Sequence, residues 1–238
     1  MKQSGTSALL QGAVQDLASS VVSALRGGGH APSAAAAVGA SLGDDLTFAA
    51  ARVLGADLLL PGILRRTTPP QEHLAVIRRT LALFPPRPQA APTVQWSHWA
   101  MRRSLRLAGD APTTTGSWAA GPEEPEPDTA WIDGAPWPQL THQLAVLAPL
   151  ALPGEDCAVA RVARARPLDV SRGFVRAVRR RDWQQAAGAG RWLATLDDVP
   201  HTLGLDKGLD FVELMSDGDP RVLLQVQAAR LMRAGAYA

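Results

Sequence analysis

Paired carboxylates are the side chains in this sequence with the clearest capacity for chemistry. Asp206 and Asp210 stand four residues apart, a spacing that places two carboxylates on one face of a helix. Such a pair could hold a metal ion or act as general acid and base. Two further pairs are adjacent in the sequence: Asp44 with Asp45, and Asp197 with Asp198. Asp44 and Asp197 stand where helices are expected to start or stop, so capping accounts for them without catalysis.

The other residue types that carry catalysis are scattered along the chain. The five histidines form no pair with metal-ligand spacing: His30, His73, His98, His142 and His201. The sequence holds no glycine-rich phosphate loop and no GxSxG motif. Cys157 is the single cysteine, which excludes an internal disulfide, and a small buried residue is favoured over a reactive thiol. We therefore predict no catalytic, metal or cofactor site, and the question of enzymatic activity stays open but leans toward none.

The composition indicates an all-α fold. Hydrophobic residues make up 46% of the chain but aromatic residues only 5%, so the apolar content is mainly Ala, Leu and Val. The formal net charge of +2 is too small to indicate a partner by itself. Lys2 and Lys207 are the only lysines, so nearly all the positive charge is carried by arginine.

The last third of the chain, residues 167–235, has the most consistent helix signals. Asp182 and Asp219 stand at N-cap positions, and Pro220 follows in the first turn of the final helix. Small residues in the segment 183–194 would let another backbone approach closely. The final helix is apolar on two sides, as expected for a helix packed between neighbours.

The last helical hairpin resembles one unit of a HEAT-like repeat. In FVELMSDGDPRVLLQVQAARLM, Phe211 to Met232, an Asp-Pro turn precedes a helix that opens with an arginine and an aliphatic pair. Asp44 to Ala56 echoes the acidic start and the Ala-rich body without the proline, and no constant period links the two segments. The resemblance implies a stacked-helix surface for protein binding. The expected fold is thus an irregular multi-helix bundle or a short HEAT-like helical stack.

Two helical modules are expected, residues 1–108 and 131–238, and whether they share one core stays open. Residues 109–130 are rich in Pro, Gly, Thr and acidic side chains and predict a disordered, flexible linker. The opening helix has a seam that is either a core-facing stripe or a surface for assembly with another chain: Leu10, Val14, Leu17, Val21 and Leu25. A helix from Asp44 is expected to stop before Pro61 and Gly62.

The next helix of the first module is expected to begin with a capping box at Thr68 to Gln71. Its predicted buried stripe consists of Leu74, Ile77, Leu81 and Phe84. The proline-rich run 85–92 should then form an extended connector.

Arginine and tryptophan mark the candidate partner-binding residues. One face of the helix 167–181 gathers basic side chains: Arg172, Arg176, Arg179 and Arg180. On the helix 94–108, Trp96, Trp99 and Arg103 either pack within the fold or meet a protein or nucleic acid. Trp118 stands alone in the linker, where it either tucks onto the fold or docks on another protein.

Taken together, these features predict a non-catalytic helical scaffold or adaptor that binds other proteins or copies of itself. The alternative is a nucleic-acid-binding protein that uses the arginine-rich helix 167–181. A third hypothesis is an all-α enzyme with a carboxylate site. No secretory signal is recognised, and no apolar run approaches the roughly 20 residues of a membrane span, so we expect a cytoplasmic protein without membrane contact.

Overall fold

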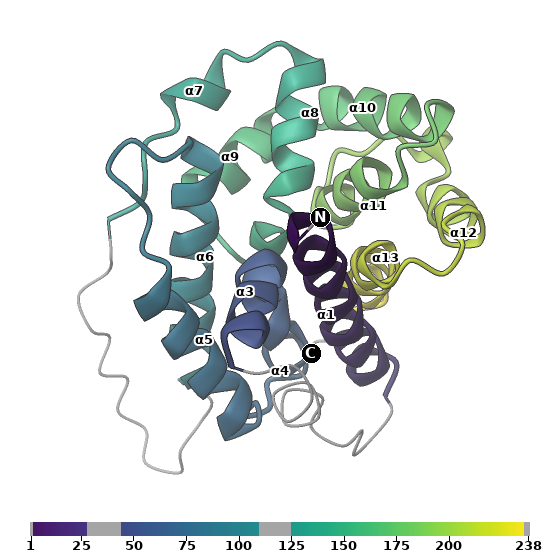
Figure 1. Cartoon of the computed structure of the whole chain (residues 1–238). Coiled ribbons are helices and arrows are strands. Elements are labelled where there is room, and N and C mark those ends of the chain that lie inside the picture. Colours follow the sequence, from purple (N-terminus) through teal and green to yellow (C-terminus); the bar gives the residue numbers. More distant parts are fainter. Residues whose placement is uncertain (1, 28–43, 110–124, 236–238) are drawn as a thin grey trace. The chain divides into compact units, whose positions relative to one another are not determined.

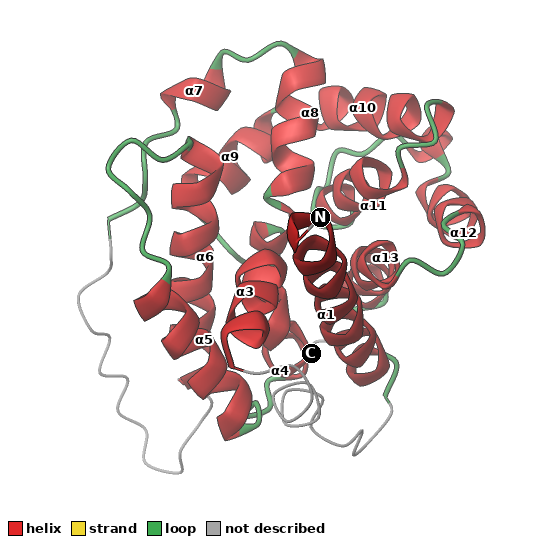
Figure 2. Ribbon diagram, in the orientation of Figure 1, coloured by secondary structure: helices red, strands yellow, loops and turns green. Residues whose placement is uncertain are grey.

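The structure, a computed structural model, is all-α over the residues it describes, 2–27, 44–109 and 125–235, and no β-strand occurs among them (Figure 1, Figure 2). The all-α prediction is therefore confirmed. The chain divides into two compact units, Met1–Pro127 and Asp128–Ala238. Trp118 and most of the predicted linker lie outside the described residues, so their roles stay predictions.

Unit 1 is built on the opening helix and the segments that pack against it. Its elements are α1 (Lys2–Leu25), α3 (Asp44–Leu54), the 3-10 helix η1 (Gly55–Leu59), α4 (Leu60–Arg65), α5 (Gln71–Leu83) and α6 (Pro92–Gly109). Helix α1 packs on α3, α3 packs on α5, and α6 packs against both α5 and η1. Four seam residues of α1 are at most 5% exposed, as expected for a core-facing stripe: Val14, Leu17, Val21 and Leu25.

Several local expectations for unit 1 are wrong. The helix from Asp44 does end before Pro61, at Leu54, but Pro61 and Gly62 do not break the chain. Pro61 lies in the first turn of α4, where a missing N–H removes no helical hydrogen bond. The capping box does not form, since α5 is preceded by Pro70 and no side chain caps it. Phe84 follows the end of α5 and is 38% exposed, whereas Thr80 occupies a fully buried position.

Unit 2 is arranged around one buried helix. Its elements are α7 (Ala130–Asp133), α8 (Trp137–Val146), the 3-10 helix η2 (Ala148–Leu150), α9 (Ala158–Ala165), α10 (Pro167–Arg179), α11 (Trp183–Leu193), the 3-10 helix η3 (His201–Leu203), α12 (Leu205–Met215) and α13 (Pro220–Arg233). Helix α11 contacts α8, α10, α12 and α13, and every residue from Ala186 to Leu193 is buried (Figure 1). Helix α11 therefore positions the surface helices α10 and α12.

Small residues allow α11 to be buried on all sides. A methyl group on Gly188 would lie 2.7 Å from the carbonyl oxygen of Ala145, so the backbones of α11 and α8 are in direct contact. The predicted N-caps are confirmed, because Asp182 accepts from the backbone N–H of Gln185 and Asp219 accepts from that of Arg221. These features agree with the expectation of close packing in the last third of the chain.

Among the described residues, two helical stretches are long and apolar enough to cross a membrane by length and composition, Thr6–Leu25 and Asp45–Arg65. The expectation that no apolar run approaches this length is therefore wrong. The second stretch changes helix type at Gly55, whose φ is +66°, and 61% of its most apolar window is buried in the fold. Core helices rich in alanine and leucine reach the same mean hydropathy as a membrane span.

Candidate binding surfaces

The four arginines predicted on the helix 167–181 are all exposed, along α10 and just beyond its end. Arg172 pairs with Asp169 at an N–O distance of 3.3 Å. The guanidinium carbon of Arg176 lies 5.4 Å from the centroid of the Trp137 ring, a cation–π geometry. Two of the four predicted side chains are thus engaged within unit 2.

The arginines at the end of α10 differ in their ion pairing from those near its start. Within the described residues, no carboxylate pairs with Arg179, Arg180 or the following Arg181. Earlier arginines in unit 2 do have acidic partners, since Arg164 pairs with Asp156, and Arg166 with Asp169 at 2.7 Å. Cations at a helix C-terminus are favourable for the helix, but three adjacent ones leave positive charge available to a ligand. We refer to Arg179–Arg181 as the arginine end.

Helix α12 carries a second apolar side that the sequence analysis missed. Phe211, Leu214 and Met215 are 45%, 77% and 38% exposed. Leu214 and Met215 follow Phe211 by three and four residues, so the three share one side of the helix. This side is separate from the buried stripe of the same helix, which consists of Leu205, Leu209 and Val212. A second apolar stripe at helical spacing was the signal in the sequence. An apolar stripe left open to solvent on a well-packed helix is a candidate surface for a partner.

The apolar side of α12 adjoins the arginine end. The rings of Trp183 and Phe211 meet edge to face, with centroids 6.0 Å apart and an interplanar angle of 75°. Trp183 is the first residue of α11 and follows Arg181 by two positions. We define the α12 face as Trp183, Phe211, Leu214 and Met215. The α12 face thus places exposed apolar side chains next to the arginine end, whose positive charges have no acidic partner among the described residues.

Both carboxylates of the predicted pair on α12 are engaged by arginines of α13. Asp206 accepts hydrogen bonds from Arg233 at 2.6 and 2.9 Å, and Asp210 accepts one from Arg230 at 2.7 Å. The hydrogen bond from Arg233 holds the pKa of the Asp206 carboxyl below its ordinary value. These side chains tie α12 to α13, and the described residues include no group of three or more potential metal ligands.

The tryptophans of α6 belong to the core of unit 1. Trp96 is fully buried and Trp99 is 5% exposed, and their ring centroids lie 5.3 Å apart in an edge-to-face arrangement. Arg103 is half-buried on the same helix. The burial agrees with the packing alternative, because neither indole face is open for a base or a protein to stack upon.

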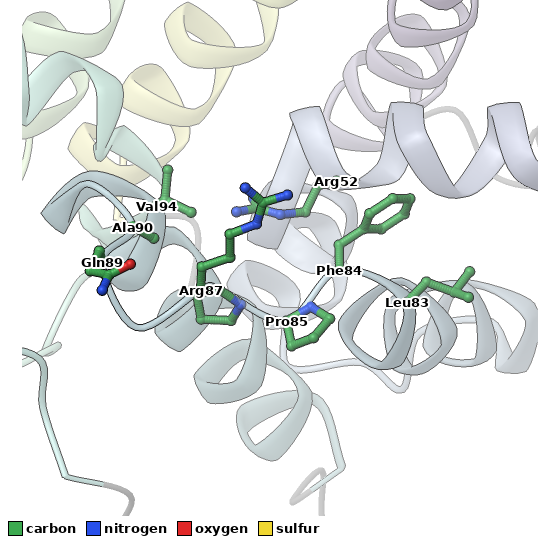
Figure 3. A pocket seen from close by; sticks show the side chains of 9 residues that line it. Arg52, Leu83, Phe84, Pro85, Arg87, Gln89, Ala90 and Val94 are labelled. Atoms are coloured by element: carbon green, nitrogen blue, oxygen red, sulfur yellow. The ribbon is translucent and has the colours of Figure 1, made fainter.

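Unit 1 has a groove between α3 and the connector that joins α5 to α6 (Figure 3). Its volume is about 670 Å³, and it is lined by Arg52, Leu83, Phe84, Pro85, Pro86, Arg87, Gln89, Ala90 and Val94. Both arginine side chains extend into the space between α3 and the connector (Figure 3). The sequence did not predict the groove, because it joins residues from α3 and the connector, and Phe84 was expected in the core.

The fold and these surfaces define an all-α protein with exposed apolar and basic side chains on both units. Comparison of the chain with protein-family models, with curated proteins and with solved structures finds no match. The functional argument therefore depends on the geometry of the surfaces themselves.

Proposed function

We propose that this chain is a non-catalytic helical adaptor that binds another protein through the α12 face. The observation that carries the proposal is the exposed apolar stripe of α12, where Leu214 is 77% exposed on a helix whose other side is fully packed. A solvated leucine at a fixed position stabilises a complex once it is covered, by roughly 1.5–3 kcal/mol. The partner also supplies acidic side chains, because the adjoining arginine end has no carboxylate partner in the described residues.

The resemblance of Phe211–Met232 to a HEAT-like unit is part of this proposal. In that interpretation, α12 and α13 form a hairpin whose outer helix is presented to a partner, while α13 is held between α11 and α12. The three ion pairs from Arg230 and Arg233 to α12 help to fix the position of the outer helix. An adaptor needs such a fixed surface, because ordering a loose helix on binding would weaken the complex.

Site-directed photo-crosslinking in the native host tests the proposal. A photoreactive phenylalanine derivative replaces Leu214 in the full chain, and a second version carries it at Leu168, which is 57% exposed on α10. We expect one protein to be captured from position 214 and not from position 168. Its purified form should bind the wild-type chain, and Leu214→Ser should weaken that binding about tenfold, while Leu168→Ser leaves it unchanged.

Two other results would contradict the proposal and favour a different function. Capture of only a second copy of the chain at position 214 would indicate self-assembly instead of an adaptor. A single-stranded oligonucleotide that binds at low salt and is weakened by Arg179→Gln or Arg180→Gln, with no protein captured, would establish the nucleic-acid alternative.

A further inference from the structure

The groove in unit 1 combines features that call for an anionic ligand. It is lined by two guanidinium groups, Arg52 and Arg87, and by no carboxylate. Among the described residues, neither arginine has an acidic partner. Two cations in one groove with no counter-charge repel each other, and an anion between them would relieve that repulsion. The charge arrangement therefore selects negative ligands.

Arg52 gives the strongest reason to expect such a ligand. Its side chain is half-buried where α3 borders the groove, and burial lowers the pKa of its guanidinium. A charged group taken partly out of water without a partner is destabilising, so buried charges in proteins are normally paired. Arg161, an arginine of unit 2, is more exposed and still lies near a carboxylate, 3.5 Å from Asp156.

Most of the residues that line the groove are apolar. Leu83, Phe84 and Val94 are 40%, 38% and 36% exposed, and all three line the groove (Figure 3). Pro85 and Pro86 form part of the wall, and the proline ring fixes the backbone φ of each, so little conformational entropy is lost there on binding. A ligand with apolar side chains beside its negative charge would cover this surface.

From these observations we infer that the groove binds a short acidic segment of a partner protein, with a carboxylate between Arg52 and Arg87 and a large apolar side chain against Phe84. An extended peptide fits better than a compact metabolite, because the groove is more open than enclosed and would leave a small molecule largely in water. A bidentate arginine–carboxylate contact would give the complex its orientation. This site is separate from the α12 face and does not depend on it.

Selection of peptides by the full chain tests the inference. A phage-displayed library of random peptides is selected on the wild-type chain, with an Arg52→Gln/Arg87→Gln double variant used for counter-selection. The double variant keeps the α12 face, so peptides that bind there are removed. We expect the recovered peptides to combine Asp or Glu with a large apolar residue. In fluorescence anisotropy, each single arginine variant should bind a recovered peptide about tenfold more weakly than wild type.

Matched variants separate the groove from general charge effects. Arg79→Gln removes an exposed arginine of α5 that does not line the groove, and it should leave affinity unchanged. Phe84→Ala should weaken binding without changing its dependence on salt, because it removes apolar contact only. Circular dichroism confirms that each variant is folded.

Several outcomes would overturn the inference. Recovered peptides without acidic residues would exclude the proposed charge recognition, as would failure to enrich any peptide. Equal binding to the wild type and the double variant would exclude the groove as the site. Inorganic phosphate that displaces every recovered peptide, together with no effect of Phe84→Ala, would indicate a small-anion site instead. An oligonucleotide that binds the groove more tightly than any peptide would indicate a nucleic-acid site. The crosslinking result at Leu214 bears on none of these outcomes.

Discussion

Replacement of Gly188 by alanine tests the contact on which the architecture of unit 2 depends. The added methyl carbon would lie 2.7 Å from the carbonyl oxygen of Ala145 and 2.9 Å from its Cα. Both distances are well inside van der Waals contact, and both atoms belong to the backbone of α8. No rotation of a side chain can relieve the overlap, so the helices must move apart.

The magnitude follows from two opposing effects. Alanine is preferred over glycine inside a helix by about 1 kcal/mol. Overpacking of a core typically costs about 1–3 kcal/mol, and a backbone obstacle places this case toward the upper end. We therefore expect Gly188→Ala to be less stable than wild type by roughly 1–2 kcal/mol. Gly12→Ala in α1 is the reference, because nothing lies within 4 Å of the added carbon there. That variant should gain up to about 1 kcal/mol.

Urea unfolding followed by circular dichroism measures both free energies of unfolding. The stability difference between the two variants reports the overlap at Gly188, because the gain in helix propensity is common to both. The difference should be about 2–3 kcal/mol in the direction that disfavours Gly188→Ala. A Gly188→Ala variant at least as stable as the wild type would refute the backbone contact between α8 and α11.

Four further predictions concern single side chains. Thr80→Val should stabilise the chain by about 1 kcal/mol in thermal melts, because the Thr80 hydroxyl is buried without a hydrogen-bond partner among the described residues. Thr141→Val should destabilise it by a similar amount, because the Thr141 hydroxyl donates to the carbonyl of Trp137 at 2.7 Å. Burial lowers the pKa of His73 from the ordinary 6.5, with Glu72 acting in the opposite sense. The unfolded chain therefore binds the proton more readily, so stability should fall as the pH drops below about 6.5. Melts of His73→Gln at pH 7.5 and pH 5 should show a smaller loss than the wild type. Asp219→Ala should lower the free energy of unfolding by about 0.5–2 kcal/mol through loss of the N-cap, while Asp219→Asn, which keeps the acceptor, should lie close to wild type.

Each of these has a result that contradicts it. Equal shifts for both threonine variants would mean that the environments of the two hydroxyls do not differ. An identical pH dependence for the wild type and His73→Gln would assign the acid sensitivity to other groups. Equal stability of the alanine and asparagine variants at position 219 would show that the cap contributes nothing measurable.

The sequence predicts unit 2 better than unit 1 because the signals in unit 2 are local. Asp182 and Asp219 cap helices that begin at the next residue, and the fixed φ of Pro220 suits the first turn whatever lies around it. The small residues of α11 likewise predict close packing, and they can be recognised within a single stretch of sequence. Such features need no knowledge of the rest of the fold.

Unit 1 shows why other features cannot be predicted in this way. Pro61 is compatible with a break and with a first helical turn, and only the position of the preceding helix end decides between them. Phe84 continues the periodic stripe of α5 in the sequence, but α5 ends at Leu83, so the stripe no longer applies. A shift of one residue at a helix end therefore moves an aromatic ring from the core to a groove.

The charge of both candidate surfaces is also difficult to predict from the sequence, because it depends on which arginines find acidic partners in the fold. The sequence gives a nearly balanced chain, with 24 basic and 22 acidic residues, which indicates no preference for an anionic partner. The structure shows that neutralisation is uneven, since Arg230 and Arg233 are paired with acids of α12, whereas Arg52 and Arg87 meet no acid in the described residues. A charge that is already paired contributes little to recognition, while an unpaired one beside apolar surface contributes both attraction and orientation. The proposed preference for acidic partners therefore rests on which arginines have no acidic partner among the described residues, and not on how many arginines the chain contains.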